Sequence, residues 1–213
     1  EGDVVVNLVI VTLILVGGIG FIVWDDVIRN KWHFRKYLLH SKIVLATTLI
    51  LTIVGTILFL FTENQASFAG MSPLEKLLGA LFSSVTPRTA GFNTVDTAAL
   101  SNAGKIITIV MMFIGGSPGS TAGGVKTTSI VVLLFYAGAM VLNREDINLF
   151  GRRLTEDVVK KANAVVIINF SLAIIAAVII MILQPLLNFE DVIFEVLSAI
   201  GTVGMTTGVT RSM

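Results

Sequence analysis

The chain has 213 residues, of which 54% are hydrophobic and 14% are charged, and its formal net charge is +1. A soluble domain typically has about 25% charged residues, so this composition excludes an ordinary cytosolic enzyme and indicates an integral membrane protein. The chain has no cysteine and only two histidines, which excludes disulfides, thiolate metal sites and cysteine nucleophiles.

Long stretches without Asp, Glu, Lys or Arg divide the chain into predicted membrane spans. About 18 or more such residues are typical of a helix that crosses a bilayer. The uncharged stretches cover residues 4–24, 43–62, 106–125, 127–143 and 162–189. The third and fourth together fit one interrupted crossing, so we expect an all-α polytopic membrane protein with four crossings. Because the chain begins with Glu1 and ends just after a polar loop, we also expect it to be a piece of a longer protein.

Basic residues are concentrated in two of the loops between these spans. Residues 24–42 and 143–161 together hold ten of the fifteen Lys and Arg residues, whereas 62–75, 92–104 and 184–191 hold none. An excess of Lys and Arg marks the cytoplasmic side of a membrane. We therefore expect both basic loops to be cytoplasmic in a multi-pass protein of the plasma membrane.

Two helix-like segments, residues 73–86 and 191–201, are too short to cross the membrane. Each follows a span that leads outward, and an inward span follows the first of them. We therefore interpret both as re-entrant half-helices. Non-helical backbone at membrane depth is tolerated only where it is buried in protein or lines water, so the segments that follow should line an aqueous path.

The segments after the two half-helices have nearly the same sequence. Residues 89–94 (TAGFNT) align with residues 202–207 (TVGMTT) at an offset of 113 residues. A T-x-G tripeptide alone occurs by chance in many loops, so the interpretation depends on its recurrence after matching half-helices. The pattern predicts an internal repeat of span, half-helix, T-x-G loop and span.

The T-x-G loop has the chemistry needed to replace the water around a cation. Stacked backbone carbonyls can substitute for the hydration shell of an ion in a pore, and glycine permits the backbone angles that this stacking requires. Neither loop contains a carboxylate, which favours a monovalent ion because divalent sites usually recruit Asp or Glu. The predicted filter residues are Thr89, Ala90, Gly91, Phe92, Asn93, Thr202, Val203, Gly204, Met205 and Thr206.

A segment rich in glycine and hydroxyl side chains interrupts the third crossing. As one helix, the 40 residues 103–142 would extend about 60 Å, twice the thickness of the hydrocarbon core. The break begins about 18 Å below the outer surface, which predicts a loop beneath the filter that obstructs the pore or moves aside. The predicted gate residues are Gly115, Gly116, Ser117, Pro118, Gly119, Ser120, Thr121, Ala122, Gly123, Gly124 and Lys126.

Two other interpretations of this segment remain open. Residues 119–127 (GSTAGGVKT) differ by one position from a phosphate-binding loop, because Val125 separates Gly124 from Lys126. That motif also requires a preceding strand, whereas an apolar membrane segment precedes it here. The glycines could instead form a packing kink at a helix contact. Lys126 either acts as a plug or counter-charge for the loop or extends to the inner membrane surface.

Three segments resemble one family of transporters. Residues 83–96 (SSVTPRTAGFNTVD), 111–129 (MMFIGGSPGSTAGGVKTTS) and 198–208 (SAIGTVGMTTG) are similar to the potassium-transporter superfamily that includes the Trk, Ktr and plant HKT proteins. The basic loop at 143–162 is most similar to the Ktr branch. The resemblance covers essentially the whole chain, and it implies repeated span–pore helix–filter–span units around a central ion pore.

The resemblance also implies how the chain is organised. Residues 1–23 correspond to the last helix of a preceding repeat, 43–142 to a complete repeat, and 161–213 to the front of a final, truncated repeat. Residues 24–42 and 143–160 correspond to cytoplasmic loops. The family further implies K⁺ as the transported ion, a homodimer surrounded by membrane lipid, and a cytosolic nucleotide-binding ring subunit as the regulatory partner.

Two charged residues are predicted to support the filter from behind. Arg88 precedes Thr89, where an exposed positive charge would repel the ion, so we expect it to point away from the pore toward a carboxylate. Glu195 is one candidate for this partner, and Glu75 and Asp96 are the others. A direct role of Arg88 in selectivity remains the alternative.

These observations and the resemblance together predict potassium uptake across the plasma membrane, down the electrochemical gradient, with Na⁺ as a second candidate ion. No catalytic residue, organic cofactor or nucleic-acid site is expected. The alternatives are an ion-coupled secondary transporter with alternating access at its broken helices and a non-conducting membrane scaffold. One glycine per filter loop suggests moderate selectivity for K⁺ over Na⁺.

Overall fold

The computed structural model describes residues 3–31, 33–144 and 147–211. Its elements are, in chain order, α1 (Val4–Ile19), α2 (Phe21–Asn30), the 3₁₀ turn η1 (Phe34–Lys36), α3 (Leu39–Glu63), α4 (Pro73–Val85), the 3₁₀ turn η2 (Thr97–Ala99), α5 (Asn102–Phe113), α6 (Thr127–Val141), β1 (Asn148–Leu149), β2 (Arg152–Arg153), α7 (Glu156–Leu183), α8 (Phe189–Ile200) and the 3₁₀ turn η3 (Val209–Arg211). The predicted all-α class is confirmed, with one addition: β1 and β2 pair as a short antiparallel hairpin within the basic loop 143–161.

Among the described residues, α3 and α7 are long and apolar enough to cross a membrane, at 25 and 28 residues. The pair α1 and α2 adds a third crossing if it is counted as one bent span. Helices α5 and α6 are apolar but have only 12 and 15 residues. The third predicted crossing is therefore interrupted between Phe113 and Thr127, around the expected break.

The first crossing differs from the prediction because it ends in a sharp bend. The sequence predicts a helix over residues 4–24 and a loop over 24–42, but the axis turns by 93° between α1 and α2, and α2 extends to Asn30. The bend lies at Gly20, whose φ of 89° is unfavourable for residues with a Cβ. A Cβ there would also lie 2.6 Å from the hydroxyl oxygen of Ser117. The bend therefore involves a contact with a distant loop, which hydrophobic periodicity does not reveal.

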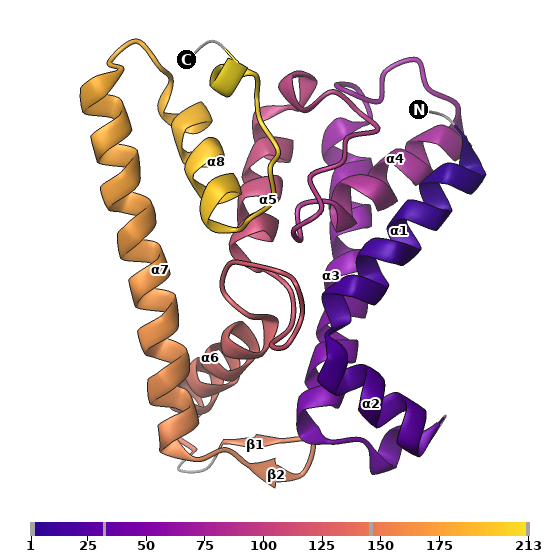
Figure 1. The fold of residues 1–213 in the computed structure, drawn as a ribbon, viewed down its shortest axis with the longest axis vertical. Coiled ribbons are helices and arrows are strands. Elements are labelled where there is room, and N and C mark those ends of the chain that lie inside the picture. The colour runs from indigo at the N-terminus through magenta and orange to yellow at the C-terminus, as the bar shows by residue number, and fades with distance from the viewer. Residues whose placement is uncertain (1–2, 32, 145–146, 212–213) are drawn as a thin grey trace.

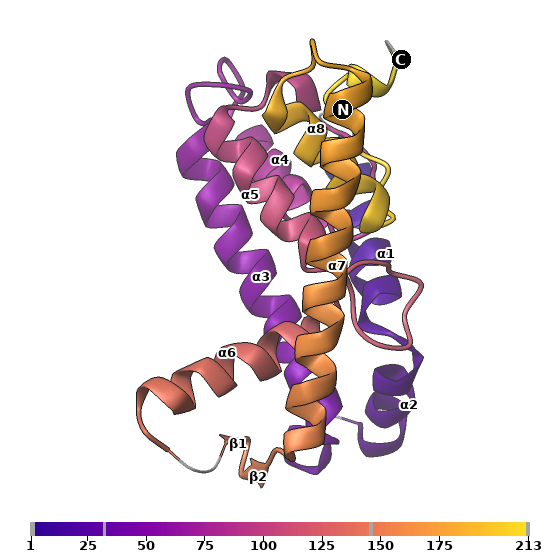
Figure 2. The same ribbon diagram turned by 90° about the vertical axis from the view of Figure 1, so that its left-hand side faces the viewer.

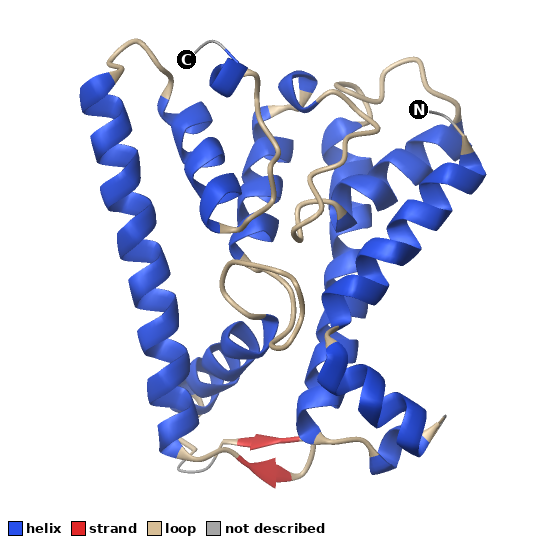
Figure 3. Cartoon of the chain, in the orientation of Figure 1, coloured by secondary structure: helices blue, strands red, loops and turns tan. Residues whose placement is uncertain are grey.

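The two half-helices lie inside a frame of longer helices (Figure 1). Helix α7 forms one side of the frame and α1 and α3 form the other, with α4 beside α1 and α3, and with α5 and α8 between the two sides. The non-helical segments that follow α4 and α8 run through the centre, next to the long loop that joins α5 to α6 (Figure 3). Helix α6 leaves the bundle at a steep angle to α7 (Figure 2).

Helix α8 packs between α5 and α7 through a buried apolar cluster. Val192 and Phe194 of α8 are buried against Met112 at the end of α5. On α7, the cluster includes Ala173 and Ala177, and such small residues allow close approach of helices in a membrane. This packing holds the second half-helix beside the centre of the molecule.

Helix α4 begins at a capping box and packs closely on α3. The Ser72 hydroxyl accepts the N–H of Glu75, whose carboxylate accepts the N–H of Ser72, and Pro73 is the first helical residue. In α3, Gly55 leaves room for α4, because a Cβ there would lie 2.9 Å from the Cβ of Ser84. The local sequence thus sets where the first half-helix starts and which helix it contacts.

A buried carboxylate joins the end of α3 to the start of α5. Glu63 is fully buried and accepts hydrogen bonds from the Ser67 hydroxyl at 2.8 Å and from the Ser101 N–H at 3.2 Å. The Ser101 hydroxyl also donates to it. Gly104 leaves room for this carboxylate, because a Cβ there would lie 2.1 Å from Glu63 Oε1. The sequence analysis missed this residue, since a lone Glu at the end of an apolar run resembles a surface residue.

We predict that Glu63→Ala lowers the free energy of unfolding of the full-length protein by about 1–3 kcal/mol, because buried donors on Ser67 and Ser101 lose their acceptor. The control is Glu156→Ala, which removes an exposed carboxylate 3.3 Å from Lys160 and should leave stability unchanged. Denaturant titration in detergent micelles measures both variants. Equal losses of stability would contradict the structural role of Glu63.

Candidate functional site

The two T-x-G loops share an unusual backbone conformation. The φ angle is positive at Thr89 (82°) and Gly91 (72°), and again at Thr202 (53°) and Gly204 (83°). A positive φ is rare for a β-branched residue such as Thr and persists only where the surroundings enforce it. The residue between each pair is not among the described residues with positive φ, so the sign of φ alternates in the same way in both loops. The two loops are therefore repeats in backbone geometry as well as in sequence.

Hydroxyl groups at the ends of α4 and α8 hold the loops in place. The Thr86 hydroxyl donates to the Phe92 carbonyl at 2.6 Å, and the Ser198 hydroxyl donates to the Met205 carbonyl at 2.6 Å. Phe92 and Met205 are equivalent residues, so the same carbonyl is fixed by a hydroxyl in each loop. The carbonyls of Thr86 and Ser198 accept N–H groups of the loops, which places the negative ends of both helix dipoles beside them. The sequence analysis singled out neither hydroxyl.

The structure brings the two predicted filter loops into contact. A Cβ added to Gly91 would lie 2.1 Å from the carbonyl oxygen of Val203, whereas a Cβ on Gly204 would meet nothing within 4 Å. The Phe92 side chain is exposed, whereas that of its equivalent Met205 is buried. The backbone is thus repeated, while the packing around it differs between the loops.

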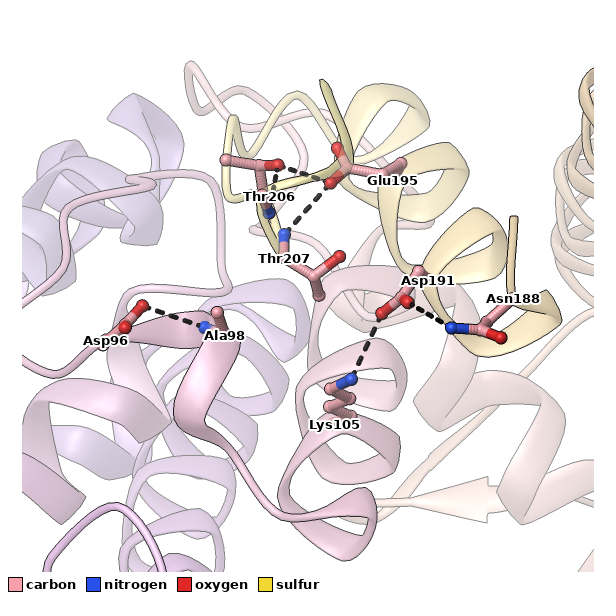
Figure 4. Close-up of polar contacts among 9 residues, drawn as sticks. Asp96, Ala98, Lys105, Asn188, Asp191, Glu195, Thr206 and Thr207 are labelled. Carbon is pink, nitrogen blue, oxygen red and sulfur yellow. Dashed lines mark hydrogen bonds and ion pairs between the residues drawn. The ribbon is translucent and has the colours of Figure 1, made fainter. Parts of the chain in front are cut away.

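Glu195 on α8 holds the chain that follows the second loop (Figure 4). Its carboxylate accepts a hydrogen bond from the Thr207 N–H at 3.0 Å and others from the hydroxyls of Thr206 and Thr210 at 2.5 and 2.6 Å. These contacts fix residues 206–210 to α8; the role of Glu195 as a filter support stays a prediction.

An ion pair that the sequence analysis missed joins α5 to α8 near the same segment. Lys105 Nζ lies 3.1 Å from a carboxylate oxygen of Asp191, and both side chains are largely buried. Figure 4 shows this pair beside Thr207, with Asn188 on the other oxygen of Asp191. The pair fixes the start of α8 against α5.

The prediction that Arg88 pairs with a carboxylate is wrong. Arg88 is 6% exposed, and within the described ranges its guanidinium donates to the Thr52 hydroxyl on α3 at 2.9 Å. The three candidate carboxylates bond elsewhere: Glu75 to the start of α4, Asp96 to the N–H of Ala98 in η2, and Glu195 to the second loop. The Arg88 side chain thus reaches α3, which offers a hydroxyl instead of a carboxylate.

The loop between α5 and α6, residues 114–126, is closed at its base by backbone hydrogen bonds. The Gly115 N–H donates to the Val125 carbonyl at 2.9 Å, and the Thr127 N–H donates to the Gly116 carbonyl at 3.1 Å. The two sides approach so closely that a Cβ on Gly115 would lie 2.0 Å from the Gly123 carbonyl oxygen. The segment is therefore an ordered loop and not a simple kink in one helix. It follows a helix, whereas a phosphate-binding loop would follow a strand.

The far end of this loop is bound to the bend between α1 and α2. The Ser117 N–H donates to the Gly18 carbonyl at 3.1 Å, and the Phe21 N–H donates to the Gly119 carbonyl at 3.1 Å. The Ser117 hydroxyl donates to the Ile19 carbonyl. Residues at the bend and residues of the loop 114–126 thus form hydrogen bonds with each other's backbone N–H and carbonyl groups.

The loop also contacts the second T-x-G loop directly. The Gly123 N–H donates to the Thr202 hydroxyl oxygen at 3.0 Å. Lys126 donates to the Ala122 carbonyl, so its ammonium group belongs to the loop's own hydrogen-bond network. Residues 114–126 therefore connect the bend at Gly20 to Thr202.

Comparisons with known proteins agree with the resemblance of the motifs. The family model of the TrkH cation transport proteins matches residues 2–213. The chain is 40% identical to the potassium/sodium uptake protein NtpJ of Enterococcus hirae and 35% identical to the Ktr system potassium uptake protein B of Bacillus subtilis, over 100% of this chain. It also matches the crystal structure of the potassium transporter TrkH from Vibrio parahaemolyticus, with a TM-score of 0.67 and 19% identity.

The chain spans about half the length of these proteins. It covers 48% of each of the two uptake proteins and 53% of the crystallised TrkH chain, while 100% of this chain is matched. The likeness to the crystallised TrkH chain supports the fold alone, because the identity is low.

We predict that Gly91→Ala destabilises the full-length protein more than Gly204→Ala. Both substitutions place a side chain on a left-handed backbone, which costs about 1–2 kcal/mol, but only the first also clashes with the Val203 carbonyl. Thermal unfolding midpoints in detergent measure the difference. Gly138→Ala in α6 is the control, because a Cβ there meets nothing within 4 Å and the position is helical. Equal midpoints for the two loop variants would contradict the close contact between the loops.

Proposed function

Because the chain belongs to the TrkH family of cation transport proteins, we propose that it forms part of a potassium uptake pathway across the cell membrane. One observation carries the proposal: two loops, 113 residues apart, adopt the same alternating backbone with a glycine at Gly91 and Gly204. The names of its relatives, potassium and potassium/sodium uptake proteins, support potassium as the ion, with sodium as a second candidate. The function is transport and not catalysis.

In this proposal, the two loops supply part of a selectivity filter. Carbonyls of residues 89–93 and 202–206 replace the water around the ion, and the negative ends of α4 and α8 favour a cation beside them. The other filter loops come from the rest of the full-length protein, since this chain spans about half the length of its relatives. Residues 43–142 form one complete repeat, and residues 1–23 and 161–213 belong to its neighbours.

The loop of residues 114–126 acts as the gate. In the conformation described here it lies against Thr202 at the second filter loop, where it obstructs the ion path. Its glycines allow it to move aside, and Lys126 provides the positive charge of the closed state.

The membrane potential drives the ion inward, at about 2.3 kcal/mol per charge per 100 mV. The basic loops 24–42 and 143–161 are cytoplasmic. There they dock a nucleotide-binding ring subunit, and the full-length protein is a homodimer in the plasma membrane.

The proposal is tested in cells that lack other potassium uptake, with the full-length protein as the transporter. We predict that Gly204→Ser lowers the ratio of K⁺ to Na⁺ influx by roughly tenfold, or about 1.4 kcal/mol of preference, because a side chain on this left-handed backbone distorts the filter. Gly138→Ser is the matched control, since that glycine lies in open space on α6. Its influx ratio should equal that of the wild type.

Deletion of residues 116–123 tests the gate in the same cells. The proposal expects a higher K⁺ influx, because the obstruction is removed while the filter loops remain. If Gly204→Ser and the deletion both transport like the wild type, the two T-x-G loops are only turns and the proposal is wrong.

A further inference from the structure

Among the described residues, the gate loop is hydrogen-bonded to the side chain of one of the two filter threonines, Thr202. Thr89 and Thr202 are equivalent residues, and both have a positive φ. Within the part of the chain that the structure describes, the Gly123 N–H donates to the Thr202 hydroxyl at 3.0 Å, while the hydroxyl of Thr89 has no hydrogen bond with the gate loop. This hydrogen bond is a further difference between the two copies of the filter.

The contact depends on the absence of a side chain at Gly123. A Cβ there would lie 2.4 Å from Thr202 Oγ1 and 2.9 Å from the Gly201 carbonyl oxygen. The φ of Gly123 is not in the left-handed region, so conformational freedom is not the reason for glycine at this position. Glycine at this position allows the gate loop to approach the second filter loop closely, so that the backbone N–H of Gly123 reaches the Thr202 hydroxyl.

The donor is polarised by a charge on the same loop. Lys126 donates to the Ala122 carbonyl, and that carbonyl belongs to the same peptide group as the Gly123 N–H. A cation on the carbonyl of a peptide strengthens its N–H as a donor, because hydrogen bonds in a chain polarise one another. Lys126, the Ala122–Gly123 peptide and Thr202 therefore form a relay that directs positive potential at the Thr202 hydroxyl oxygen.

We propose that the Thr202 hydroxyl oxygen is a ligand for which the closed gate loop and an ion in the filter compete. The inference rests on the proposed function, since it requires a cation at the second filter loop. A hydroxyl oxygen has two acceptor lone pairs, and the Gly123 N–H takes one of them. A cation on the other lone pair is repelled by the partial positive charge of that N–H and by the nearby ammonium group of Lys126.

The competition couples the gate to the filter in both directions. A closed loop lowers the affinity of the filter position at Thr202 for K⁺, and K⁺ at that position loosens the loop by the same factor, because coupling between two binding equilibria is reciprocal. Only the contact at Thr202 is released in this step. The bonds at the base of the loop and at Gly18 and Gly119 can remain.

The test measures the mobility of the loop in the full-length protein, reconstituted in lipid vesicles. A nitroxide spin label is attached at Thr121→Cys in a cysteine-free background, because Thr121 is exposed on the loop. Its mobility is followed by electron paramagnetic resonance as K⁺ replaces N-methylglucamine. We expect K⁺ to increase the mobility of the label. If the protein takes up K⁺ but the mobility of the label does not change, this inference is overturned and the proposed function stands. If the wild-type protein does not take up K⁺, both are overturned.

The matched pair of threonines provides the decisive comparison. Thr202→Val should give a mobile label without K⁺ and no further response, and Thr202→Ser should restore the response. Thr89→Val should keep the K⁺-induced increase, with a shifted midpoint, because among the described residues that hydroxyl has no hydrogen bond with the loop. Identical behaviour of Thr202→Val and Thr89→Val would overturn the proposal.

Two further variants test the relay. Gly123→Ala should give a mobile label without K⁺, because its methyl group displaces the loop from Thr202. Lys126→Gln should lower the K⁺ concentration at the midpoint by at least about fivefold, the lower end of typical couplings between sites. Lys160→Gln, a substitution on the exposed start of α7, is its control. A midpoint in Lys126→Gln equal to that of the control would show that Lys126 does not polarise the donor.

Discussion

Non-helical backbone within a membrane protein must satisfy its polar groups either with partners in the protein or by lining water. This constraint explains the arrangement of the centre of the molecule. The two T-x-G loops take their hydrogen bonds from the ends of their own half-helices, through Thr86 and Ser198. The loop between α5 and α6 takes them from its own base, from the bend at Gly20 and from Thr202. Three irregular segments can therefore coexist among apolar helices.

The two copies of the repeat share a backbone but differ in the residues around it. Arg88 beside the first loop is bonded to a hydroxyl of α3, and Glu195 is bonded to three threonines at and after the second. Among the described residues, the loop of residues 114–126 has a side-chain hydrogen bond with the second copy, through Thr202. A single chain with unequal repeats can assign different roles to equivalent positions, which four identical subunits could not do. In our proposal, the asymmetry at Thr202 couples the gate to one side of the filter.

The sequence predicts those features that depend on a local pattern. It does not predict features that are determined by contacts between residues far apart in the chain. Charge-free stretches indicated the long helices, and the 113-residue offset indicated the repeat that the φ angles of Thr89 and Thr202 display. The bend at Gly20 was missed because its cause, Ser117, lies almost a hundred residues further along the chain. The predicted partner of Arg88 was wrong because electrostatic reasoning favours a carboxylate, whereas the packing of α3 places a hydroxyl within hydrogen-bonding distance of Arg88.

The central claim is that the two loops coordinate a monovalent cation through their carbonyl groups. The most direct test is a crystal structure of the full-length protein grown with Rb⁺ or Tl⁺ in place of K⁺, with the anomalous signal measured at the absorption edge of the ion. The account predicts an anomalous peak within coordination distance of the carbonyl oxygens of residues 89–91 and 202–204. Ordered loops with the same backbone and no anomalous peak between them, at ion concentrations that support uptake, would contradict it.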